Sequence, residues 1–222
     1  MIRKIQLTLL SILTLCCTCI TYIAINKDNI KVNAKQTTIM LDAGHGGYDS
    51  GSVAIDDTLE KDYNLKIVKA LGKVLKSKGY NVVYTRTSDK VSWSDDNKED
   101  LQARCDLAKS KNADYFISIH LNASNYYDDG ASGYEIYCDF NNSKTKKLSK
   151  SILNQLDNLN YSTNRGLQDT NETSLYVVSK NTVPAILVEA GFITDSNDMY
   201  YIQNNTDQLA QAISKGISKS IQ

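Results

Sequence analysis

The chain has 222 residues, and its 25 basic and 25 acidic side chains give a formal net charge of zero. This balance gives no electrostatic reason to expect a nucleic acid or an anionic membrane surface as a partner. The length suits one domain of ordinary size, and the single proline together with the many tyrosines indicates an ordered globular domain without long linkers.

The first 35 residues differ in kind from the rest of the chain. Arg3 and Lys4 precede an uncharged, largely apolar stretch at residues 5–25, and a mostly polar segment follows it. This pattern is typical of an export signal. The apolar stretch approaches the length of a membrane-spanning helix, so two interpretations stay open, a signal peptide cleaved after Ala34 and a retained membrane anchor. We therefore expect residues 1–35 to be a signal peptide or anchor and residues 36–222 to form one exported domain.

The cysteines divide between these two parts. Three of the five lie inside the apolar stretch, where a lipoprotein would carry its lipid on one of them. Leu15, directly before Cys16, is larger than the residue that such processing prefers, which argues against a lipoprotein. Only Cys105 and Cys138 belong to the expected domain, so the sequence does not predict a disulfide framework.

From residue 38 onward, short apolar runs alternate with amphipathic segments. The expected strands are residues 38–41, 81–85, 115–120, 133–138, 174–178 and 183–189, and the expected helices are residues 60–78, 99–111, 144–159 and 207–221. Strands that alternate with helices predict an α/β fold, here a single three-layer domain with a largely parallel mixed sheet of about six strands flanked by helices.

The two histidines of the chain occupy equivalent places in this pattern. His45 follows the first strand in a glycine-rich turn, and His120 closes the strand at residues 115–120. The carboxyl ends of parallel strands form the edge of a sheet where ligands bind. Histidines buried in the core for ordinary packing are the alternative, but two independent placements at strand ends favour a functional pair.

Two histidines alone make a poor zinc site, because catalytic zinc usually has three protein ligands and an open position for water. A third ligand would have to be a carboxylate. The candidates are Asp42, Asp49, Asp56, Asp57, Glu60, Asp62 and Glu189. Glu60 begins the first helix, where the chain returns to the same end of the sheet. An interaction with the helix dipole is an equally ordinary role for an acid at that position.

Glu189 ends a run of aliphatic residues, so its carboxyl group is expected to be partly removed from water. Burial raises a carboxyl pKa toward neutrality, which suits a general base. The alternative is a buried ion pair with Arg86 or Arg104. Asn122 lies two residues past His120 and on the same side of an extended chain, where it either orients a substrate or closes a turn.

Five short motifs carry a resemblance to a known family. They read L-D-A-G-H-G-G-Y-D-S-G at residues 41–51, L-E-K-D at 59–62, T-R-T at 85–87, I-S-I-H-L-N-A-S at 117–124 and L-V-E-A-G-F-I-T-D at 187–195. As a set in this order, they resemble the zinc-dependent N-acetylmuramoyl-L-alanine amidases of the amidase-3 type. Small single-domain members of this family include spore-cortex amidases. Ala43 stands where the family usually has proline and Asp195 where it often has asparagine, but neither belongs to the ligand set.

The resemblance implies roles for individual residues. His45, Glu60 and His120 would hold a zinc ion, and Glu189 would act as the catalytic acid and base. Zinc lowers the pKa of bound water to about 7 and polarises a carbonyl. Glu189 would take the proton of that water and pass it to the departing amine. The implied reaction cleaves the amide bond between the lactyl group of N-acetylmuramic acid and L-alanine of the stem peptide in peptidoglycan.

Two other functions stay open at this point. A zinc peptidase acting on the stem peptide would use the same groups, and a non-catalytic wall-binding protein could keep a relict of the site. The four retained functional residues argue against the second. The expected partners are peptidoglycan, a membrane only through residues 1–35, and an activating protein. The expected location is outside the cytoplasm, in association with the cell wall, with a role in sporulation or germination.

Overall fold

The computed structural model describes residues 36–54 and 56–221. The expected signal peptide or anchor at residues 1–35, with its three cysteines, lies outside the described residues. By its internal contacts the chain divides after residue 36, and the second unit comprises residues 37–222. In the part that the structure describes, no helix has the length and hydrophobicity needed to cross a membrane.

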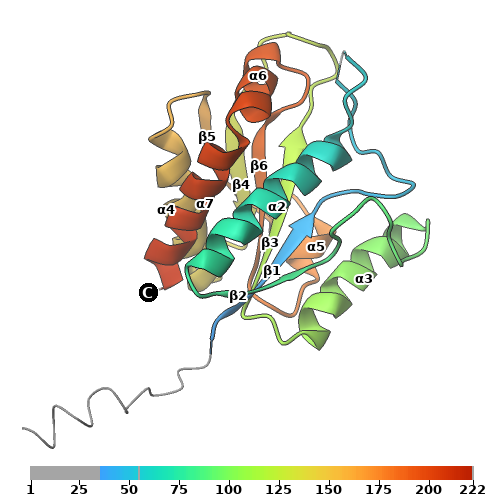
Figure 1. Cartoon of the computed structure of the whole chain (residues 1–222), viewed down its shortest axis with the longest axis vertical. Helices are drawn as coiled ribbons and strands as arrows, with labels where there is room; N and C mark the ends of the chain where they lie inside the picture. The colour runs from blue at the N-terminus through green and yellow to red at the C-terminus, as the bar shows by residue number, and fades with distance from the viewer. Residues whose placement is uncertain (1–35, 55, 222) are drawn as a thin grey trace, which may run out of the picture. The chain divides into compact units, whose positions relative to one another are not determined.

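The domain is built on one six-stranded sheet with the strand order β2-β1-β3-β6-β4-β5 (Figure 1). The parallel part consists of β2 (Asn81–Tyr84), β1 (Thr38–Ala43), β3 (Tyr115–Asn122) and β6 (Ala185–Phe192). The remaining strands are β4 (Tyr134–Cys138), which runs antiparallel to β6, and β5 (Asn164–Asp169), which runs parallel to β4. The central strands β1, β3 and β6 are mostly buried and aliphatic, as is usual for strands covered on both faces.

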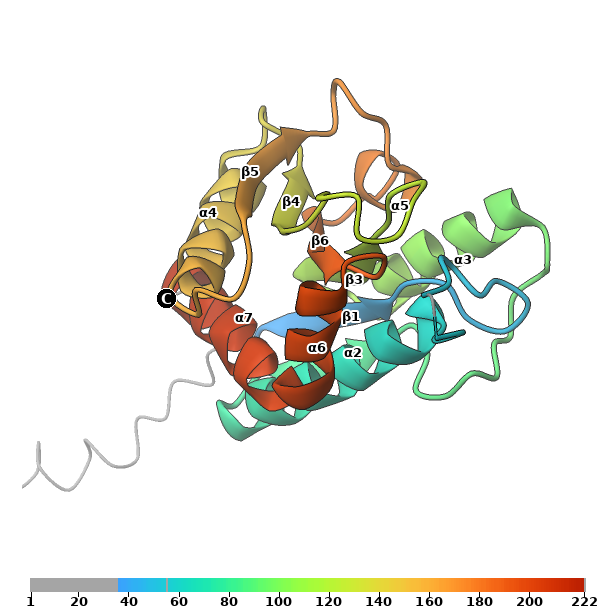
Figure 2. The same ribbon diagram turned by 90° about the horizontal axis from the view of Figure 1, so that it is seen from above.

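Helices cover the sheet on both faces (Figure 2). The larger layer consists of α2 (Glu60–Ser77), α4 (Ser143–Asp157) and α7 (Thr206–Ile221), and the smaller one of α3 (Asn97–Ser110) and α5 (Tyr176–Ser179). Alternate side chains of β1 reach the two layers, since Ile39 and Leu41 join the first core and Met40 joins the second. The expected three-layer fold with a largely parallel mixed sheet of six strands is confirmed.

Three local elements differ from the sequence prediction. The strand expected at residues 174–178 is wrong, because this segment leads into the one-turn helix α5, where Val177 and Val178 are buried. Packing of these two side chains outweighs the preference of valine for strands. The sixth strand is β5 instead, a partly exposed edge strand with the polar sequence N-R-G-L-Q-D, which lacks an apolar signature. The helix α6 (Ser196–Asn204) was also not expected, although Asp195 caps it by accepting a hydrogen bond from the Asp198 amide at 2.8 Å.

Both cysteines of the domain are buried free thiols. Cys138 on β4 belongs to the core beneath α4 and α7. Cys105 is on α3, which covers the opposite face of the sheet. The sheet therefore separates the two thiols.

A buried arginine, Arg104 on α3, holds the loop that follows β1. Its Nη1 donates to Asp42 Oδ1 at 2.8 Å and to the Ala43 carbonyl at 3.1 Å, and its Nη2 donates to the His45 carbonyl at 2.9 Å. Asp100, one turn earlier on α3, accepts from Arg104 Nε at 2.6 Å. Two carboxylates and two backbone carbonyls therefore compensate the burial of this guanidinium.

A second arginine, Arg86, follows β2 and donates hydrogen bonds to the same loop. Its Nε donates to the Ala43 carbonyl at 2.9 Å, and its Nη2 donates to the carbonyls of Gly44 at 2.9 Å and Lys61 at 2.7 Å. The Lys61 contact links the loop to the first turn of α2. Loop, β2 and helix are thus fastened at one point.

We expect Arg104→Leu to lower the free energy of unfolding by about 3–5 kcal/mol, because Asp42 would stay buried without a cation. Urea denaturation measures this change. Lys109→Ala, an exposed change on the same helix, is the matched control and should stay within about 0.5 kcal/mol. A loss for Arg104→Leu no larger than that of the control would contradict the proposed contribution of the ion pair.

Candidate metal centre

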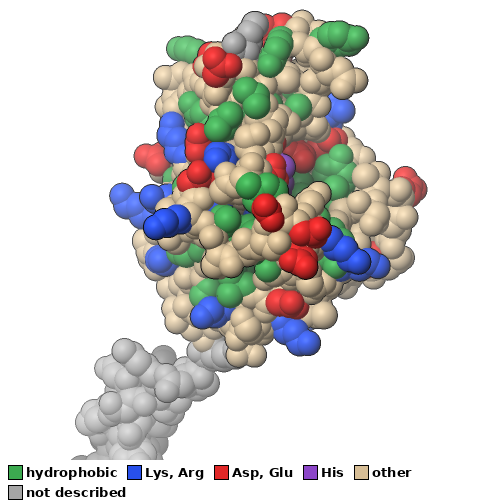
Figure 3. Space-filling view, turned by 90° about the vertical axis from the view of Figure 1, so that its right-hand side faces the viewer, with side chains coloured by type: hydrophobic (Ala, Val, Ile, Leu, Met, Phe, Trp, Pro, Cys, Tyr) green, Lys and Arg blue, Asp and Glu red, His purple; other side chains and the backbone are tan. Residues whose placement is uncertain are grey.

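Three neighbouring parallel strands bring functional side chains to one edge of the sheet. His45 follows β1, while His120 and Glu189 are on β3 and β6 and lie opposite each other in the strand register. In the space-filling view a histidine lies at the bottom of a recess, with acidic side chains beside it (Figure 3). The placement at carboxyl strand ends, expected from the sequence, is what the parallel topology produces.

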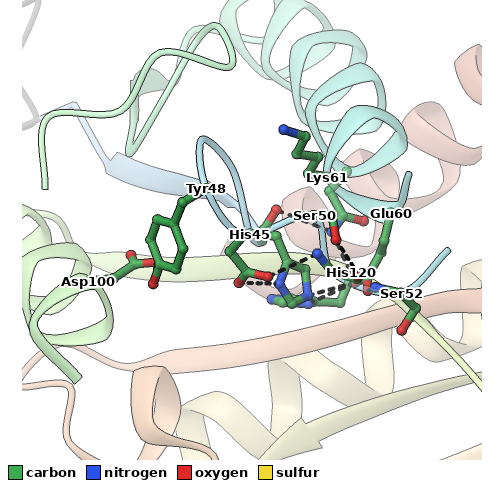
Figure 4. A network of polar contacts seen from close by, with 12 residues as sticks. His45, Tyr48, Ser50, Ser52, Glu60, Lys61, Asp100 and His120 are labelled. Atoms are coloured by element: carbon green, nitrogen blue, oxygen red, sulfur yellow. Dashed lines mark hydrogen bonds and ion pairs between the residues drawn. The ribbon is translucent and has the colours of Figure 1, made fainter. Parts of the chain in front are cut away.

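The turn after β1 sets the direction of the His45 ring. His45 has a backbone φ of 61° and Gly46 one of 124°, so the chain reverses in a region that glycine enters without strain. After the reversal, the His45 ring lies beside His120 and Glu60 (Figure 4). Its Nδ1 is 2.6 Å from Asp49 Oδ2. A carboxylate on one ring nitrogen fixes the tautomer and leaves the other nitrogen as a ligand atom.

Glu60 is the first residue of α2, and its carboxylate is 2% exposed. Its Oε2 accepts a hydrogen bond from the Ser52 amide at 2.9 Å. Its Oε1 accepts from the Leu121 amide and from Asn64 Nδ2, both at 3.1 Å. Loop, strand and helix therefore position this carboxylate, and a helix-dipole interaction alone does not describe its environment.

The two imidazole rings converge on this carboxylate. His45 Nε2 and His120 Nδ1 each lie 3.1 Å from Glu60 Oε1, and the ring centroids are 4.8 Å apart with an interplanar angle of 76°. A side chain at Gly44 would place its Cβ 2.2 Å from His120 Nε2, so the ring needs a glycine beside it. The sequence-predicted histidines and Glu60 thus form one cluster.

This cluster has the composition of a metal site. One ligand atom from each of His45, Glu60 and His120 lies within 4.8 Å of the others. Two imidazole nitrogens with one carboxylate oxygen form a donor set known from catalytic zinc sites, and the Asp49 contact to His45 is the usual outer support of a ligating histidine. The residues present therefore fit a divalent metal ion.

The electrostatics of the cluster also favour a cation. Burial alone would lower the pKa of His45, but the hydrogen bond and charge of Glu60, together with Asp49, raise it to about 9. Burial works in the opposite sense on Glu60, whose hydrogen bonds with His120 and His45 nevertheless hold its pKa well below the usual range. The carboxylate therefore stays charged at neutral pH, and metal binding must displace a proton from His45.

Glu189 has a different environment. Its Oε2 is buried and has no hydrogen-bond partner among the described residues. Burial, followed by the charges of Glu60 and Glu135, raises its pKa well above the usual range. Since the polar contacts of Arg86 and Arg104 go to other groups, the alternative of a buried ion pair with either arginine is not what the structure has.

An open cleft of about 500 Å³ contains these groups. Its lining includes His45, Asp49, Glu60, His120, Asn122 and Glu189. Asn122 Nδ2 donates to Glu135 Oε1 at 2.7 Å, and Asn122 Oδ1 accepts from the Ala123 amide at 2.8 Å. The Asn122 side chain therefore lines the cleft and also fixes the carboxylate opposite Glu189.

Reasoning from the sequence did not assign Asp49 its position and missed Glu135. Asp49 was one of several carboxylates considered as a ligand, and its contact with His45 instead gives it a supporting position. Glu135 is 3% exposed and lies directly opposite Glu189 in the antiparallel pair β4 and β6. The only sequence signal for Glu135 was its place in an alternating apolar strand, because the sequences of β4 and β6 do not predict that these strands pair.

The chain is similar to proteins of one family. A family model described as N-acetylmuramoyl-L-alanine amidase, Amidase_3, matches residues 39–219. The uncharacterized protein YqiI of Bacillus subtilis is 35% identical over 81% of this chain and 82% of its own length. The germination-specific N-acetylmuramoyl-L-alanine amidase of the same bacterium is 30% identical over 81% of this chain and 77% of its own length. The chain spans only 34% of a longer amidase from that bacterium.

Solved structures agree with the sequence matches. The CwlD amidase of Clostridioides difficile, solved in complex with the GerS lipoprotein, superposes with a TM-score of 0.75 at 31% identity, over 84% of this chain and 98% of that one. The family match covers nearly all of the described domain and includes every residue of the cluster. This chain belongs to the Amidase_3 family of N-acetylmuramoyl-L-alanine amidases.

Proposed function

We infer that this chain is a zinc-dependent peptidoglycan hydrolase that cleaves the amide bond between the lactyl group of N-acetylmuramic acid and L-alanine of the stem peptide. The observation that carries this inference is the convergence of two imidazoles and one carboxylate beside Glu189, whose buried Oε2 has no hydrogen-bond partner among the described residues. Family membership supplies the substrate class.

In this proposal His45, Glu60 and His120 hold the zinc ion. When bound, zinc supplies Lewis acidity, which lowers the pKa of water to about 7 and polarises a carbonyl oxygen. Asp49 keeps the Nδ1 proton of His45 in place and thereby directs Nε2 into the cleft. The amides of Ser52 and Leu121 hold the Glu60 carboxylate against rotation.

Glu189 carries the proton in the reaction. Its Oε2 has no hydrogen-bond partner among the described residues and belongs to a side chain that lines the cleft. As a carboxylate it takes a proton from the attacking water, and as an acid it returns the proton to the departing amide nitrogen. The charges of Glu60 and Glu135 favour the protonated form, which suits the second half of this cycle.

Asn122 is the proposed substrate-binding residue. Asn122 Nδ2 donates one hydrogen to Glu135, and Asn122 Oδ1 accepts a hydrogen bond from the Ala123 amide. The second hydrogen on Nδ2 can then be donated to a carbonyl of the substrate. Asn122 can therefore form fewer hydrogen bonds with a substrate than an asparagine without these two contacts could.

Residues 1–35 are proposed to export the domain, either as a cleaved signal or as a retained anchor. Peptidoglycan is extracytoplasmic, and action there is consistent with a family of cell-wall amidases. A lipoprotein or another protein partner is part of the proposal, because the related CwlD was solved in complex with one.

Mass spectrometry of digested peptidoglycan tests the function. New free amino groups on L-alanine, with intact stem peptides, are the expected products. Cuts between amino acids of the stem would assign the chain to zinc peptidases instead. Peptidoglycan binding without any cut by zinc-loaded protein would indicate a wall-binding protein.

Removal of the metal should abolish turnover. Strong chelation is expected to reduce product release to background, and added zinc should restore it. The reason is that the three proposed ligands cannot act as a Lewis acid without the metal ion. Elemental analysis before and after chelation provides the control. Turnover by protein that is shown to be free of zinc would contradict the mechanism.

The two glutamates should respond differently to the loss of charge. Glu189→Gln is expected to keep about one zinc per chain and to lose roughly 100- to 10,000-fold in turnover, the usual contribution of a positioned acid and base. Glu60→Gln should weaken zinc binding, because an amide is a poorer ligand than a carboxylate. Zinc content and kcat, measured on both variants, decide the roles. Loss of zinc in Glu189→Gln with normal zinc in Glu60→Gln would mean that the roles are exchanged.

Asp49→Ala tests the support of His45. The change removes the carboxylate that lies 2.6 Å from Nδ1, and we expect zinc affinity to fall about 10- to 100-fold. Competition with a chromogenic chelator measures the affinity. Ser50→Ala, the neighbouring change, should leave it unaltered because the Ser50 hydroxyl donates to the Gly51 carbonyl and not to a proposed ligand. Equal affinities of the two variants would remove Asp49 from the proposal.

A chain that begins at Gln36 should fold and hydrolyse peptidoglycan, because the core and the cluster lie entirely within the unit of residues 37–222. Circular dichroism and the product assay check this, with the full chain as the comparison. A folded but inactive product in the presence of zinc would show that residues 1–35 contribute to the reaction.

A further inference from the structure

A surface beside the metal cleft carries most of the exposed aromatic side chains of the described domain. Tyr126 is 74% exposed, Tyr200 70% and Tyr127 45%, and the nearby Val53 is 38% exposed. Large side chains of this kind at the surface mark binding sites when they are grouped. Figure 3 shows hydrophobic side chains gathered above the recess that contains the histidine.

These side chains line two hollows that continue the cleft. The first, of about 340 Å³, shares Ser52 and Ala123 with the metal cleft and is also lined by Tyr126 and Tyr127. The second, of about 210 Å³, shares Tyr127 with the first and ends at Tyr200 on α6. We call these two hollows the tyrosine trough. Since the Ser52 amide donates to Glu60, the trough begins at the metal cluster itself.

Hydrogen bonds hold the trough in shape. The Tyr127 hydroxyl donates to the Val53 carbonyl at 3.0 Å, which joins the loop after β3 to the loop after β1. The Ser124 amide donates to Thr194 Oγ1 at 2.9 Å, and the Asp128 amide donates to the Thr194 carbonyl at 2.9 Å. The three loops that form the trough are therefore connected before any ligand binds, which reduces the cost of binding.

The charge of the trough favours the glycan strand of the proposed substrate over its stem peptide. Neither hollow has a lysine or arginine in the lining that the structure describes, and the second hollow includes the carboxylates Asp56, Asp128 and Asp195. Stem peptides carry free carboxylates, which this surface would repel. Glycan strands of N-acetylated sugars are uncharged once each lactyl group is bound in an amide. The faces of their pyranose rings present C–H groups that pack on the electron-rich faces of aromatic rings.

We propose that the tyrosine trough is a glycan-binding subsite that takes sugar residues adjoining the muramic acid whose amide is cut. The proposal rests on the amidase function inferred above and adds a direction to it, because the glycan strand leaves the metal centre over Tyr126 and Tyr127 toward Tyr200. The enzyme then prefers polymeric strands to single muramic acid units. Tyr126 and Tyr200 act in binding and have no part in the proton transfer.

Uncharged, peptide-free glycan strands made of N-acetylglucosamine alone provide a test that does not depend on turnover. Tyr126→Ala and Tyr200→Ala should each weaken binding of these strands about three- to tenfold, and the double variant should weaken it by about tenfold or more. Tyr126→Phe and Tyr200→Phe keep the rings and serve as matched controls with affinity close to that of the unaltered chain. Equal binding by the alanine and phenylalanine variants would overturn the proposal.

Kinetics on two substrates tests the direction of the strand. The ratio of kcat/KM on strands of several disaccharides to kcat/KM on N-acetylmuramoyl-L-alanyl-D-isoglutamine should fall by the same factors in the alanine variants, through KM. An equal fall on both substrates would assign the tyrosines a purely structural effect and overturn the subsite. Loss of stimulation by a protein partner, with glycan binding unchanged, would assign the surface to that partner and also overturn it.

The two tests separate this subsite from the proposed function. If the unaltered chain binds peptide-free strands through the tyrosines and releases no L-alanine amino groups, the amidase function fails and the subsite stands. If the chain releases them and the alanine variants match it in both assays, the subsite fails and the amidase function stands.

Discussion

The candidate site depends on hydrogen bonds from two buried guanidinium groups to the backbone turn that follows β1. Arg86 and Arg104 reach the carbonyls of Ala43, Gly44 and His45 from separate elements, one after β2 and the other on α3. A turn with a histidine at positive φ is strained in isolation, and the hydrogen bonds from both arginines stabilise it in this conformation. The direction of one imidazole is therefore fixed by residues that never touch it. A helix, a strand and a glycine-rich turn all have to assemble before the cluster exists.

Two glutamates near each other have opposite protonation preferences because their neighbours differ. Glu60 lies between two imidazoles and accepts amide hydrogen bonds on both oxygens, so its negative charge is stabilised. Glu189 is half-buried and lies opposite another carboxylate, Glu135, and its buried Oε2 has no partner among the described residues. A ligand needs a permanent charge and a proton carrier needs an adjustable one. The different environments of Glu60 and Glu189 thus agree with the two roles proposed for them.

Much of this arrangement could be predicted from the sequence, and the reason is periodicity. Buried parallel strands leave continuous aliphatic runs, so the positions of His45, His120 and Glu189 at strand ends followed from the runs beside them. Glu60 was ambiguous on spacing alone, and only the family motifs raised it above other acids. The edge strand β5 was not predictable because none of its residues is fully buried and its sequence is polar. Glu135 and the arginine contacts come from pairings between distant segments, which no local pattern encodes.

The separation of Cys105 and Cys138 by the sheet has a consequence for the environment in which the proposed enzyme works. An exported protein meets oxidants, yet Cys105 and Cys138 lie on opposite faces of the sheet and cannot form a bridge with each other. Burial raises the pKa of the Cys105 thiol to about 11 and that of Cys138 above its usual value as well. Protonated, enclosed sulfur is a poor nucleophile and a poor competitor for a soft metal. The two thiols would therefore not compete with the cluster of His45, Glu60 and His120 for a divalent metal ion.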